Sequence, residues 1–233
     1  MAQNYHFLAI FQEVQFSQGT VMDIFRLFTM ISILLFSGSA LAQRWVPFSS
    51  PEDGFRMMAP GEFEVDDIDF ESEYGIIVPA RIFRHENDIG TFTMSVIDYR
   101  DAQRLHNEKI EELDGVYLSI YGEVDVRGSI AFAAKKIRDR AESIEYDAYH
   151  YISRVDGHQL QTTNPDRSRT FGAIYLRNSR LYVSEATVVE GATPPGMFQQ
   201  SLEFIDENGE QVSYGSFREV YKVQGLSSDE QRF

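Results

Sequence analysis

The stretch Arg169–Val189, RTFGAIYLRNSRLYVSEATVV, decides the fold. It contains two apolar runs, Arg169–Leu176 and Arg180–Val189, with Arg177–Ser179 between them, so it predicts two strands joined as a hairpin. Apolar residues occupy more than one face of each run, which is typical of strands in the middle of a sheet with other layers on both sides. We therefore expect a sheet that is covered on both faces.

A second hairpin is predicted immediately before this one. The segments Ile144–Val155 and His158–Thr163 flank Asp156-Gly157, and an Asp-Gly pair favours a two-residue turn because glycine adopts positive φ without steric cost. Other short apolar or alternating segments predict further strands: Trp45–Ser50, Phe55–Ala59, Phe63–Phe70, Ile76–Arg84 and Thr91–Tyr99. In Phe63–Phe70 the alternation slips at Asp66-Asp67, which indicates a bulge or a strand end.

Helices are predicted where apolar residues recur at steps of three and four. The first has such residues at Ile110, Leu113, Tyr117 and Ile120. The second runs from Ile130 to Ala141 with Ser129 as its cap, and its alanine-rich face favours close packing on a sheet. The third starts at Pro194 with Thr193 as its cap, and three of its residues are expected to face the core: Phe198, Leu202 and Ile205. This order of elements predicts the α+β class, an antiparallel sheet with helices packed on it.

The N-terminal stretch Phe25–Arg44, FRLFTMISILLFSGSALAQR, has the organisation of a secretory signal peptide. Arg26 precedes the apolar run Leu27–Phe36, and Ala40-Leu41-Ala42 has the A-x-A form that signal peptidase recognises. The run is shorter than the ~20 residues of a membrane-spanning helix, so an uncleaved anchor and a buried core helix are the less favoured alternatives. We expect cleavage after Ala42, which leaves a periplasmic or secreted protein without a membrane anchor.

This leader divides the chain into four parts. Residues 1–21 precede Met22, a conventional start for the leader, so we expect them to be an over-extended gene start or disordered. Residues 22–42 are the signal peptide, and residues 43–210 are expected to form a single α+β domain. Residues 211–233 follow the Asn208-Gly209 turn and are expected to be a C-terminal tail that ends in the polar segment Gly225–Phe233.

The composition restricts the compartment and the partners. The chain has 36 acidic and 21 basic residues and a net charge of −15, which repels nucleic acid and anionic membranes, so we expect no nucleic-acid partner. It contains no cysteine, which excludes disulfides, thiolate metal sites and cysteine nucleophiles. It also contains no N-x-[ST] glycosylation site. These features fit an exported bacterial protein, most simply one in a Gram-negative periplasm.

The opening of the expected domain, Trp45–Val65, carries two turn motifs, Ser50-Pro51-Glu52-Asp53-Gly54-Phe55 and Ala59-Pro60-Gly61. An aromatic strand, a Pro-x-x-Gly-Phe turn and a strand ended by Pro-Gly resemble the start of bacterial domains with the PsbP-like fold. The resemblance implies that fold here. Its members include photosystem accessory proteins, a Ran-binding nuclear import factor and many exported bacterial proteins, which share a scaffold and not a chemistry. The resemblance therefore implies no catalytic residue, cofactor or metal ligand in this chain.

Histidine and serine offer the first candidate sites. His85-Glu86-x-Asp88 is the nearest approach to a metal-binding cluster, although polar residues are expected in any case before a turn at Gly90. His150 and His158 flank the predicted Asp156-Gly157 turn, where we expect an ordinary cross-strand surface pair. The sequence has no Gly-x-Ser-x-Gly motif, and Ser213–Ser216 is expected to be a turn in the tail.

Charged segments offer three more candidates. An acidic stretch is either a calcium-binding segment or the solvated face of an edge strand, which we favour. Its carboxylates are Glu62, Glu64, Asp66, Asp67, Asp69, Glu71 and Glu73. Asp206–Glu210 resembles part of a calcium loop but is explained by a plain Asn-Gly turn. Lys135–Arg140 is expected to be a solvated helix face, with an anion-binding or partner patch as the alternative.

Tyrosines cluster on the predicted strands of the second half: Tyr146, Tyr149, Tyr151, Tyr175 and Tyr182. We favour core packing for them, and a partly exposed tyrosine surface for a protein partner is the alternative. No residue is assigned as catalytic, cofactor-binding or metal-binding, and no cofactor is expected. We expect a non-catalytic accessory or protein-binding domain with a protein partner; a periplasmic hydrolase and a small-ligand or metal carrier are the alternatives. An enzyme requires a deep pocket in which a histidine and a carboxylate meet.

Export makes a direct prediction. Because the A-x-A site ends at Ala42, the mature protein is expected to begin at Gln43. Terminal mass spectrometry of the protein from a periplasmic extract measures this. A native protein that retains Leu27–Phe36 contradicts cleavage, and peptides from residues 1–21 in cells contradict a start at Met22.

Overall fold

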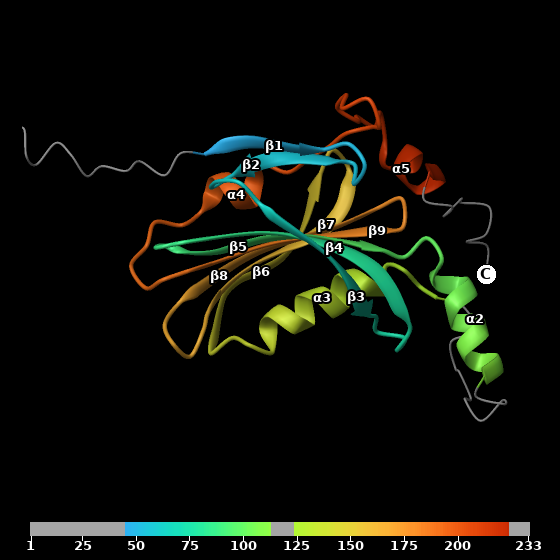
Figure 1. The fold of residues 1–233 in the computed structure, drawn as a ribbon, viewed down its shortest axis with the longest axis horizontal. Helices are drawn as coiled ribbons and strands as arrows, with labels where there is room; N and C mark the ends of the chain where they lie inside the picture. The colour runs from blue at the N-terminus through green and yellow to red at the C-terminus, as the bar shows by residue number, and fades with distance from the viewer. Residues whose placement is uncertain (1–44, 113–123, 224–233) are drawn as a thin grey trace, which may run out of the picture. The chain divides into compact units, whose positions relative to one another are not determined.

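In the described residues, seven strands form the main sheet in the order β3-β4-β5-β9-β8-β7-β6 (Figure 1). The computed structural model describes residues 45–112 and 124–223. The strands of the main sheet are β3 (Glu64–Glu71), β4 (Ile77–Asn87), β5 (Gly90–Asp98), β6 (Ser143–Ile152), β7 (Val155–Thr163), β8 (Arg169–Arg177) and β9 (Arg180–Val188). Every neighbouring pair in this order is antiparallel.

A smaller sheet and the helices accompany the main sheet. The small sheet has the order β1-β2-β10 and consists of β1 (Val46–Ser50), β2 (Phe55–Ala59) and β10 (Glu203–Phe204). The described helices are α2 (Ala102–Glu112), α3 (Gly128–Arg138), α4 (Gly196–Gln200) and α5 (Phe217–Val223). Figure 1 shows β1, β2 and α4 over one face of the main sheet and α3 under the other. The described chain is thus mostly antiparallel sheet with a few helices, as expected for the α+β class.

Some expectations fall outside the described residues. They concern residues 1–44, the first predicted helix beyond Glu112, which includes Leu113, Tyr117 and Ile120, and the end segment Gly225–Phe233. The described part of that helix is α2, which begins at Ala102 and includes Ile110. None of the described helices is both long enough and apolar enough to cross a membrane.

The β8–β9 hairpin lies in the middle of the main sheet, as predicted, with β9 between β5 and β8. The two strands pair in register up to Arg177↔Arg180. The connecting residues Asn178 and Ser179 have φ of 52° and 55°, the left-handed conformation that both central residues of a type I′ turn adopt. Such a turn follows the right-handed twist of the strands, so the hairpin continues the sheet without splaying.

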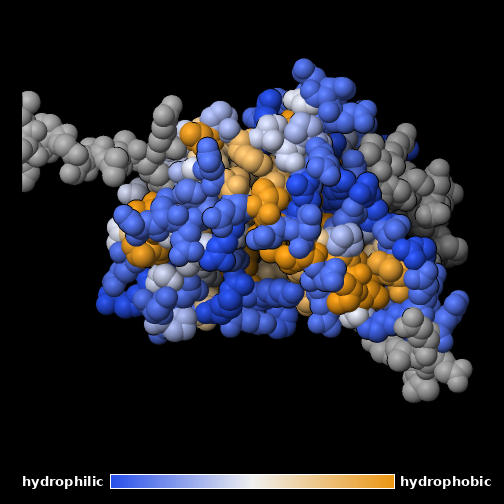
Figure 2. All heavy atoms as spheres, in the orientation of Figure 1, coloured by the Kyte–Doolittle hydropathy of each residue, from blue (hydrophilic) through white to orange (hydrophobic). Residues whose placement is uncertain are grey.

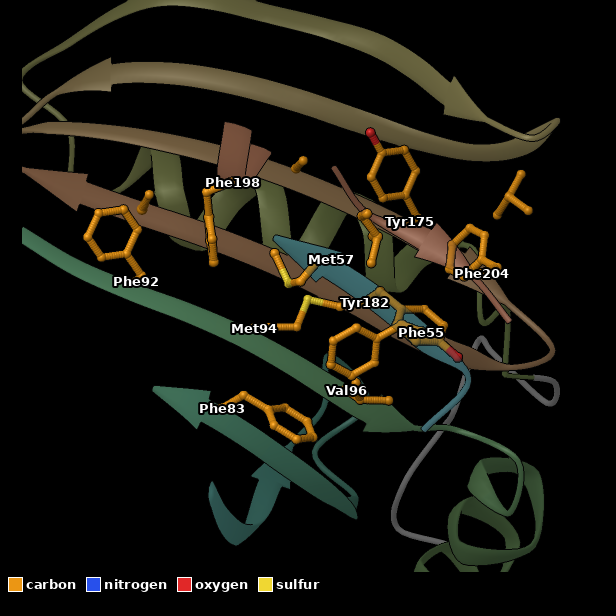
Figure 3. Packing of buried hydrophobic residues seen from close by; sticks show 14 of the residues in the cluster. Phe55, Met57, Phe83, Phe92, Met94, Val96, Tyr175, Tyr182, Phe198 and Phe204 are labelled. Atoms are coloured by element: carbon orange, nitrogen blue, oxygen red, sulfur yellow. The ribbon is translucent and has the colours of Figure 1, made fainter. Parts of the chain in front are cut away.

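Two apolar cores lie on the two faces of the main sheet, which explains the apolar character of both faces of β9. Tyr182 belongs to the core beneath the small sheet, whereas its neighbour Leu181 belongs to the core on the α3 side. Figure 3 shows large side chains of the first core: Phe55, Met57, Phe83, Phe92, Met94, Val96, Tyr175, Tyr182, Phe198 and Phe204. In the second core Gly172 of β8 permits close approach of α3, because a Cβ there would lie 2.7 Å from Cδ1 of Ile137.

The β6–β7 turn differs from the prediction. It lies at Ser153-Arg154, whose φ values are 48° and 66°, and Ile152 pairs with Val155 across it. Asp156 and Gly157 are part of β7 instead. Gly157 is required by packing rather than by a turn, because a Cβ at this position would lie 2.2 Å from the carbonyl oxygen of Ile174 and 2.3 Å from the ring of Tyr175.

The acidic strand β3 is an edge strand of the described sheet, as favoured from the sequence, but the bulge or strand end predicted at Asp66-Asp67 is wrong. The register with β4 runs unbroken from Glu64↔Arg84 to Glu71↔Ile77. Nearly all of β3 is exposed on both faces. The sequence of β3 does not keep a strict alternation of apolar and polar residues, because both faces of this strand are largely exposed and neither requires apolar side chains.

Two predicted helix caps are wrong. Arg127 occupies the N-cap of α3, and Ser129 lies inside the first turn, where its hydroxyl donates to the carbonyl of Val126 at 2.5 Å. The third helix is the short α4, whose N-cap is Pro195 rather than Thr193. Phe198 is buried in α4, as expected, whereas Leu202 and Ile205 are buried after the helix has ended.

Residues 211–223, which were expected to be part of a tail, contribute to the first core. Tyr214 and Val220 are buried there at 7% and 1% exposure. The hydroxyl of Tyr214 accepts a hydrogen bond from Nε of Arg177 at 3.0 Å. A buried aromatic and a buried aliphatic side chain anchor this segment to the domain.

Gly157 provides a test of the register of β7. Gly157→Ala is expected to lower the free energy of unfolding by about 2–3 kcal/mol, because the new Cβ overlaps backbone and ring atoms. Gly196→Ala in α4 is the matched control, since a Cβ there has no atom within 4 Å, and it is expected to change stability by less than about 1 kcal/mol. Urea denaturation measures both variants. Equal losses would contradict the packing assigned to Gly157.

Candidate functional site

The two outer strands of the main sheet carry different side chains. At one edge, β3 presents carboxylates, which discourage the addition of another strand. At the other edge, β6 is the last strand among the described residues, where it pairs with β7, and it presents exposed tyrosines. The exposed fractions are 41% for Tyr146, 60% for Tyr149 and 53% for Tyr151. The alternative interpretation, a partly exposed tyrosine surface, therefore holds for β6.

Three exposed rings, those of Tyr149, Tyr151 and Phe217, form a connected row. Tyr149 and Tyr151 have ring centroids 6.3 Å apart, and Tyr151 meets Phe217 of α5 edge to face at 5.6 Å. The hydroxyl of Tyr149 donates to Oδ1 of Asp156 at 2.5 Å. Phe217 itself is 39% exposed. We refer to Tyr146, Tyr149, Tyr151 and Phe217 as the aromatic edge.

The other two tyrosines of the predicted cluster belong to the core, as favoured from the sequence. Tyr175 and Tyr182 are each 1% exposed, and burial raises the pKa of both phenols, that of Tyr175 to about 12. Position in the sheet explains the split, because β8 and β9 are central strands and β6 is an edge strand. The hydroxyl of Tyr182 donates to the backbone carbonyl of Asp53 at 2.8 Å, so its polar end is satisfied.

A buried polar network supports the edge from behind. The hydroxyl of Tyr175 lies 2.9 Å from Nδ1 of His150 on β6 and accepts from Nε2 of Gln159 at 3.2 Å. Burial lowers the pKa of His150, which favours the neutral imidazole and lets Nδ1 accept a hydrogen bond from the Tyr175 hydroxyl. The network ties the edge strand to the central strand β8 across β7.

His158 lies on the opposite face of the sheet from His150, so the predicted cross-strand histidine pair is wrong. His150 pairs with Gly157, and His158 pairs with Tyr149, because the turn lies three residues earlier than expected. His158 contacts Asp147 through Nε2. Arg138 of α3 donates from Nε to one oxygen of Asp147 at 2.6 Å and from Nη2 to the other at 2.8 Å.

This ion network fixes the charge of Asp147 and joins α3 to β6. The hydrogen bonds from Arg138 are the largest influence on Asp147 and, with the contact to His158, they outweigh burial and lower its pKa from 3.8 to about 2. A histidine and a carboxylate thus meet, as an enzyme would require. Neither residue lines the two hollows described next, and Arg138 donates to both carboxylate oxygens of Asp147.

Two adjoining hollows lie at the β3–β4 end of the sheet, with volumes of about 420 and 480 Å³. They share Asp69, Pro79, Asp98 and Arg100 in their walls. Apolar residues of β4 and β5 lie among the charged ones, and Figure 2 shows apolar residues over the β3–β4 hairpin flanked by hydrophilic residues. We call the two hollows together the charged groove.

Carboxylates hold the main cations of the charged groove. Nη1 of Arg81 donates to Asp53 and Glu52 at 2.8 Å each, and its Nε lies 3.3 Å from Asp67. Asp98 accepts hydrogen bonds from Arg100 through both of its oxygens. Burial is the largest single influence on Asp98 and raises its pKa, but the hydrogen bonds and charge of Arg100 together outweigh it, so the pKa of Asp98 is lowered.

The sequence did not indicate the buried carboxylate of Asp53. It stands in the Ser50–Phe55 turn motif, where its side chain accepts from the Ser50 hydroxyl at 2.5 Å and from Arg81 at 2.8 Å. The first contact is a local signal, since serine three residues before aspartate is typical of a turn. The second joins segments distant in the chain, and no local pattern reports it.

The remaining candidate residues lie in β4, in a turn and at the start of α5. Nδ1 of His85 lies 2.9 Å from the carbonyl of Glu62, and the described residues contain no group of three or more histidine and carboxylate side chains placed to hold a metal ion. Oδ1 of Asp206 accepts from the amides of Asn208 and Glu210 at 2.9 Å each, which is an ordinary turn. The carbonyl and the hydroxyl of Ser216 accept hydrogen bonds from the amide of Glu219, so Ser216 caps the start of α5.

The basic segment of α3 is a solvated face with acidic partners, as favoured from the sequence. Lys135 contacts Asp139, Arg138 contacts Asp147, and Arg140 contacts Glu185. Lys136 differs, because its Nζ lies over the rings of Phe70 at 4.2 Å and Phe132 at 4.5 Å.

No protein-family model matches this sequence, and no curated protein matches it.

The Asp147 network makes a prediction about pH. Because the pKa of Asp147 is lower in the folded protein, the carboxylate stabilises the fold above about pH 4 and loses this contribution as pH falls toward 2. Asp147→Asn is expected to lower the free energy of unfolding at pH 7 by about 1 kcal/mol, a small value because solvent screens this partly exposed site. The free energy of unfolding of the variant is also expected to fall less steeply between pH 4 and 2 than that of the unsubstituted protein.

Urea denaturation at a series of pH values measures this effect. Asp88→Asn, at an exposed carboxylate in the β4–β5 turn, is the matched control and is expected to follow the unsubstituted protein closely. An Asp147→Asn curve parallel to the control at every pH would contradict the role assigned to the ion network.

Proposed function

We propose that this chain is an exported, periplasmic accessory domain of PsbP-like fold that binds a protein partner through the aromatic edge and carries out no reaction of its own. The observation that carries the proposal is the set of exposed tyrosine rings on the edge strand β6, which Phe217 of α5 extends. The leader sequence at residues 22–42 supports export, and the turn motifs of Trp45–Val65 support the fold.

Exposed tyrosines suit a protein interface for a physical reason. Their rings bury large apolar area, while the hydroxyl remains able to bond water or a partner. Aromatic residues are enriched at the centres of interfaces, and a few of them supply most of the binding energy. The aromatic edge presents three tyrosine rings and that of Phe217, and a side-chain hydrogen bond ties β6 to the central strand β8 behind it. A partner would therefore meet a surface with little conformational freedom to lose.

A small-ligand carrier is the second candidate, and the charged groove favours it. Volumes of about 420 and 480 Å³ fall in the range of ligand sites, and apolar walls with a few polar groups are typical of them. The groove ranks below the aromatic edge because its guanidinium groups at Arg81 and Arg100 are already bound by carboxylates. A ligand would have to compete with those ion pairs.

The aromatic edge predicts a loss of binding on truncation. The double substitution Tyr149→Ala and Tyr151→Ala is expected to weaken partner binding at least tenfold, because it removes about 1.4 kcal/mol or more of interface energy. Affinity capture from periplasmic extract identifies the partner, and a surface-binding assay then measures the affinity.

Ile77→Ala is the matched control, since Ile77 is 52% exposed on β4 beside the charged groove. It is expected to bind the partner as the unsubstituted protein does. If the tyrosine variant retains full affinity, or if both variants lose it equally, the aromatic edge is not the binding surface.

A further inference from the structure

The charged groove crosses three neighbouring strands of the main sheet. Asp69 of β3 pairs with Pro79 of β4, and the register of β4 with β5 places Asp98 on the other side of Pro79. All three residues line both hollows. This row therefore belongs to the part that the two hollows share, and its chemistry indicates what the groove can bind.

Pro79 leaves one backbone acceptor of this row without its usual donor. The β4–β5 turn closes on the pair Asn87↔Gly90, so hydrogen-bonded pairs recur at every second residue from there and include the position of Pro79 opposite Asp98. Proline has no N–H and is normally confined to edge strands, whereas β4 lies between β3 and β5. The carbonyl oxygen of Asp98 thus lacks the donor that another residue at position 79 would supply.

The guanidinium groups that line the groove all have partners. Carboxylates bind Arg81 and Arg100. Arg104 lies between two carboxylates, 2.7 and 3.3 Å from its guanidinium nitrogens, and Nη1 of Arg180 donates to the backbone carbonyl of Glu52 at 2.8 Å. An anionic ligand would have to displace carboxylates from these cations, so the competition with ion pairs applies chiefly to anions.

Asp69 differs from the other carboxylates of the groove. Its side chain is exposed on β3, and no described residue forms an ion pair or a hydrogen bond with its carboxylate. The walls of the two hollows carry six carboxylates and four guanidinium groups, a net charge of −2 in a chain of net charge −15. The two open groups of the row, the Asp69 carboxylate and the Asp98 carbonyl, are both acceptors. A ligand with N–H donors and a positive charge suits them.

Apolar side chains lie beside Asp69 on the same face of the sheet. Ile77 and Pro79 are two residues apart on β4, and both are exposed, Ile77 to 52%. Val96 of β5 lines one hollow, and Leu105 of α2 lines the other. An aliphatic chain would bury part of this surface, whereas a bare cation would not. The groove therefore favours a ligand that combines a cationic group with an apolar body.

We infer that the charged groove binds a small aliphatic amine, whose protonated nitrogen pairs with the Asp69 carboxylate while its carbon chain lies against Ile77 and Pro79. Such an amine is protonated at pH 7, because the pKa of an alkylammonium group is about 10. This inference rests on the second candidate function, the small-ligand carrier, and specifies its ligand. It is independent of the partner that we propose for the aromatic edge.

The test titrates the purified full chain with four probes at pH 7 and follows its backbone amides by NMR. Hexylamine has both the charge and the chain, hexanol has the chain alone, hexanoate has the chain with the opposite charge, and methylamine has the charge alone. Hexylamine is expected to bind about tenfold more tightly than each of the others, because only hexylamine satisfies both the carboxylate and the apolar surface. It is also expected to shift the amide signals of Asp69, Ile77 and Asp98.

Variants of exposed residues separate the charge from the apolar contact. Asp69→Asn is expected to weaken hexylamine binding about fivefold. Asp66→Asn is the matched control, because it removes the same charge from the other face of β3, and it is expected to bind hexylamine as the unsubstituted protein does. Ile77→Ala, which lies away from the aromatic edge, is expected to weaken hexylamine binding about threefold and to leave methylamine binding unchanged. Thermal melts verify that the three variants fold.

The outcomes distinguish this inference from the proposed functions. If hexanol or hexanoate binds in the groove as tightly as hexylamine, the preference for an amine is overturned and the small-ligand carrier stands. Equal losses in Asp69→Asn and Asp66→Asn overturn the inference, because binding would then follow the net charge of the chain. If no probe shifts the amides of the groove, the inference is overturned and the carrier loses its support. Neither result bears on the aromatic edge, whose double tyrosine variant is tested against the protein partner.

Discussion

Burial of the β8–β9 hairpin on both faces is the constraint on which the rest of the structure depends. Its residues alternate between a core beneath the small sheet and a core above α3, so layers are required on both sides. Close contact is achieved where side chains are small, as at Gly172 against Ile137. With this hairpin in the centre, the remaining strands add outward until the sheet ends at β3 and at β6.

The two ends of the sheet then meet the same physical problem in different ways. An edge strand exposes unpaired backbone groups, and proteins usually protect them with charge, bulges or cover. Strand β3 is protected by its carboxylates. Strand β6 has an irregular register near Ile144 but exposes tyrosine rings along its regular part. The two edges of the described sheet therefore differ in charge and in exposed aromatic area.

Local patterns predicted much of the fold, and the errors arose where distant residues decide. The strands around Arg169–Val189 and Thr91–Tyr99 were predicted because apolar periodicity is a local signal. Gly157 was misassigned to a turn because its small size serves packing against Tyr175 of the neighbouring strand. Likewise, the tyrosines of the second half could not be divided into buried and exposed ones from the sequence. Their burial depends on whether their strand is central or at the edge, and no local pattern encodes strand order.

The most direct measurement is amide hydrogen exchange of the free protein, residue by residue along the main sheet. The account predicts that β8 and β9 exchange most slowly, because each is paired on both sides and buried on both faces, and that the exposed strand β3 exchanges much faster. Exchange in β8 and β9 as fast as in β3 would contradict it, because the hairpin would then not be the stable centre of the fold.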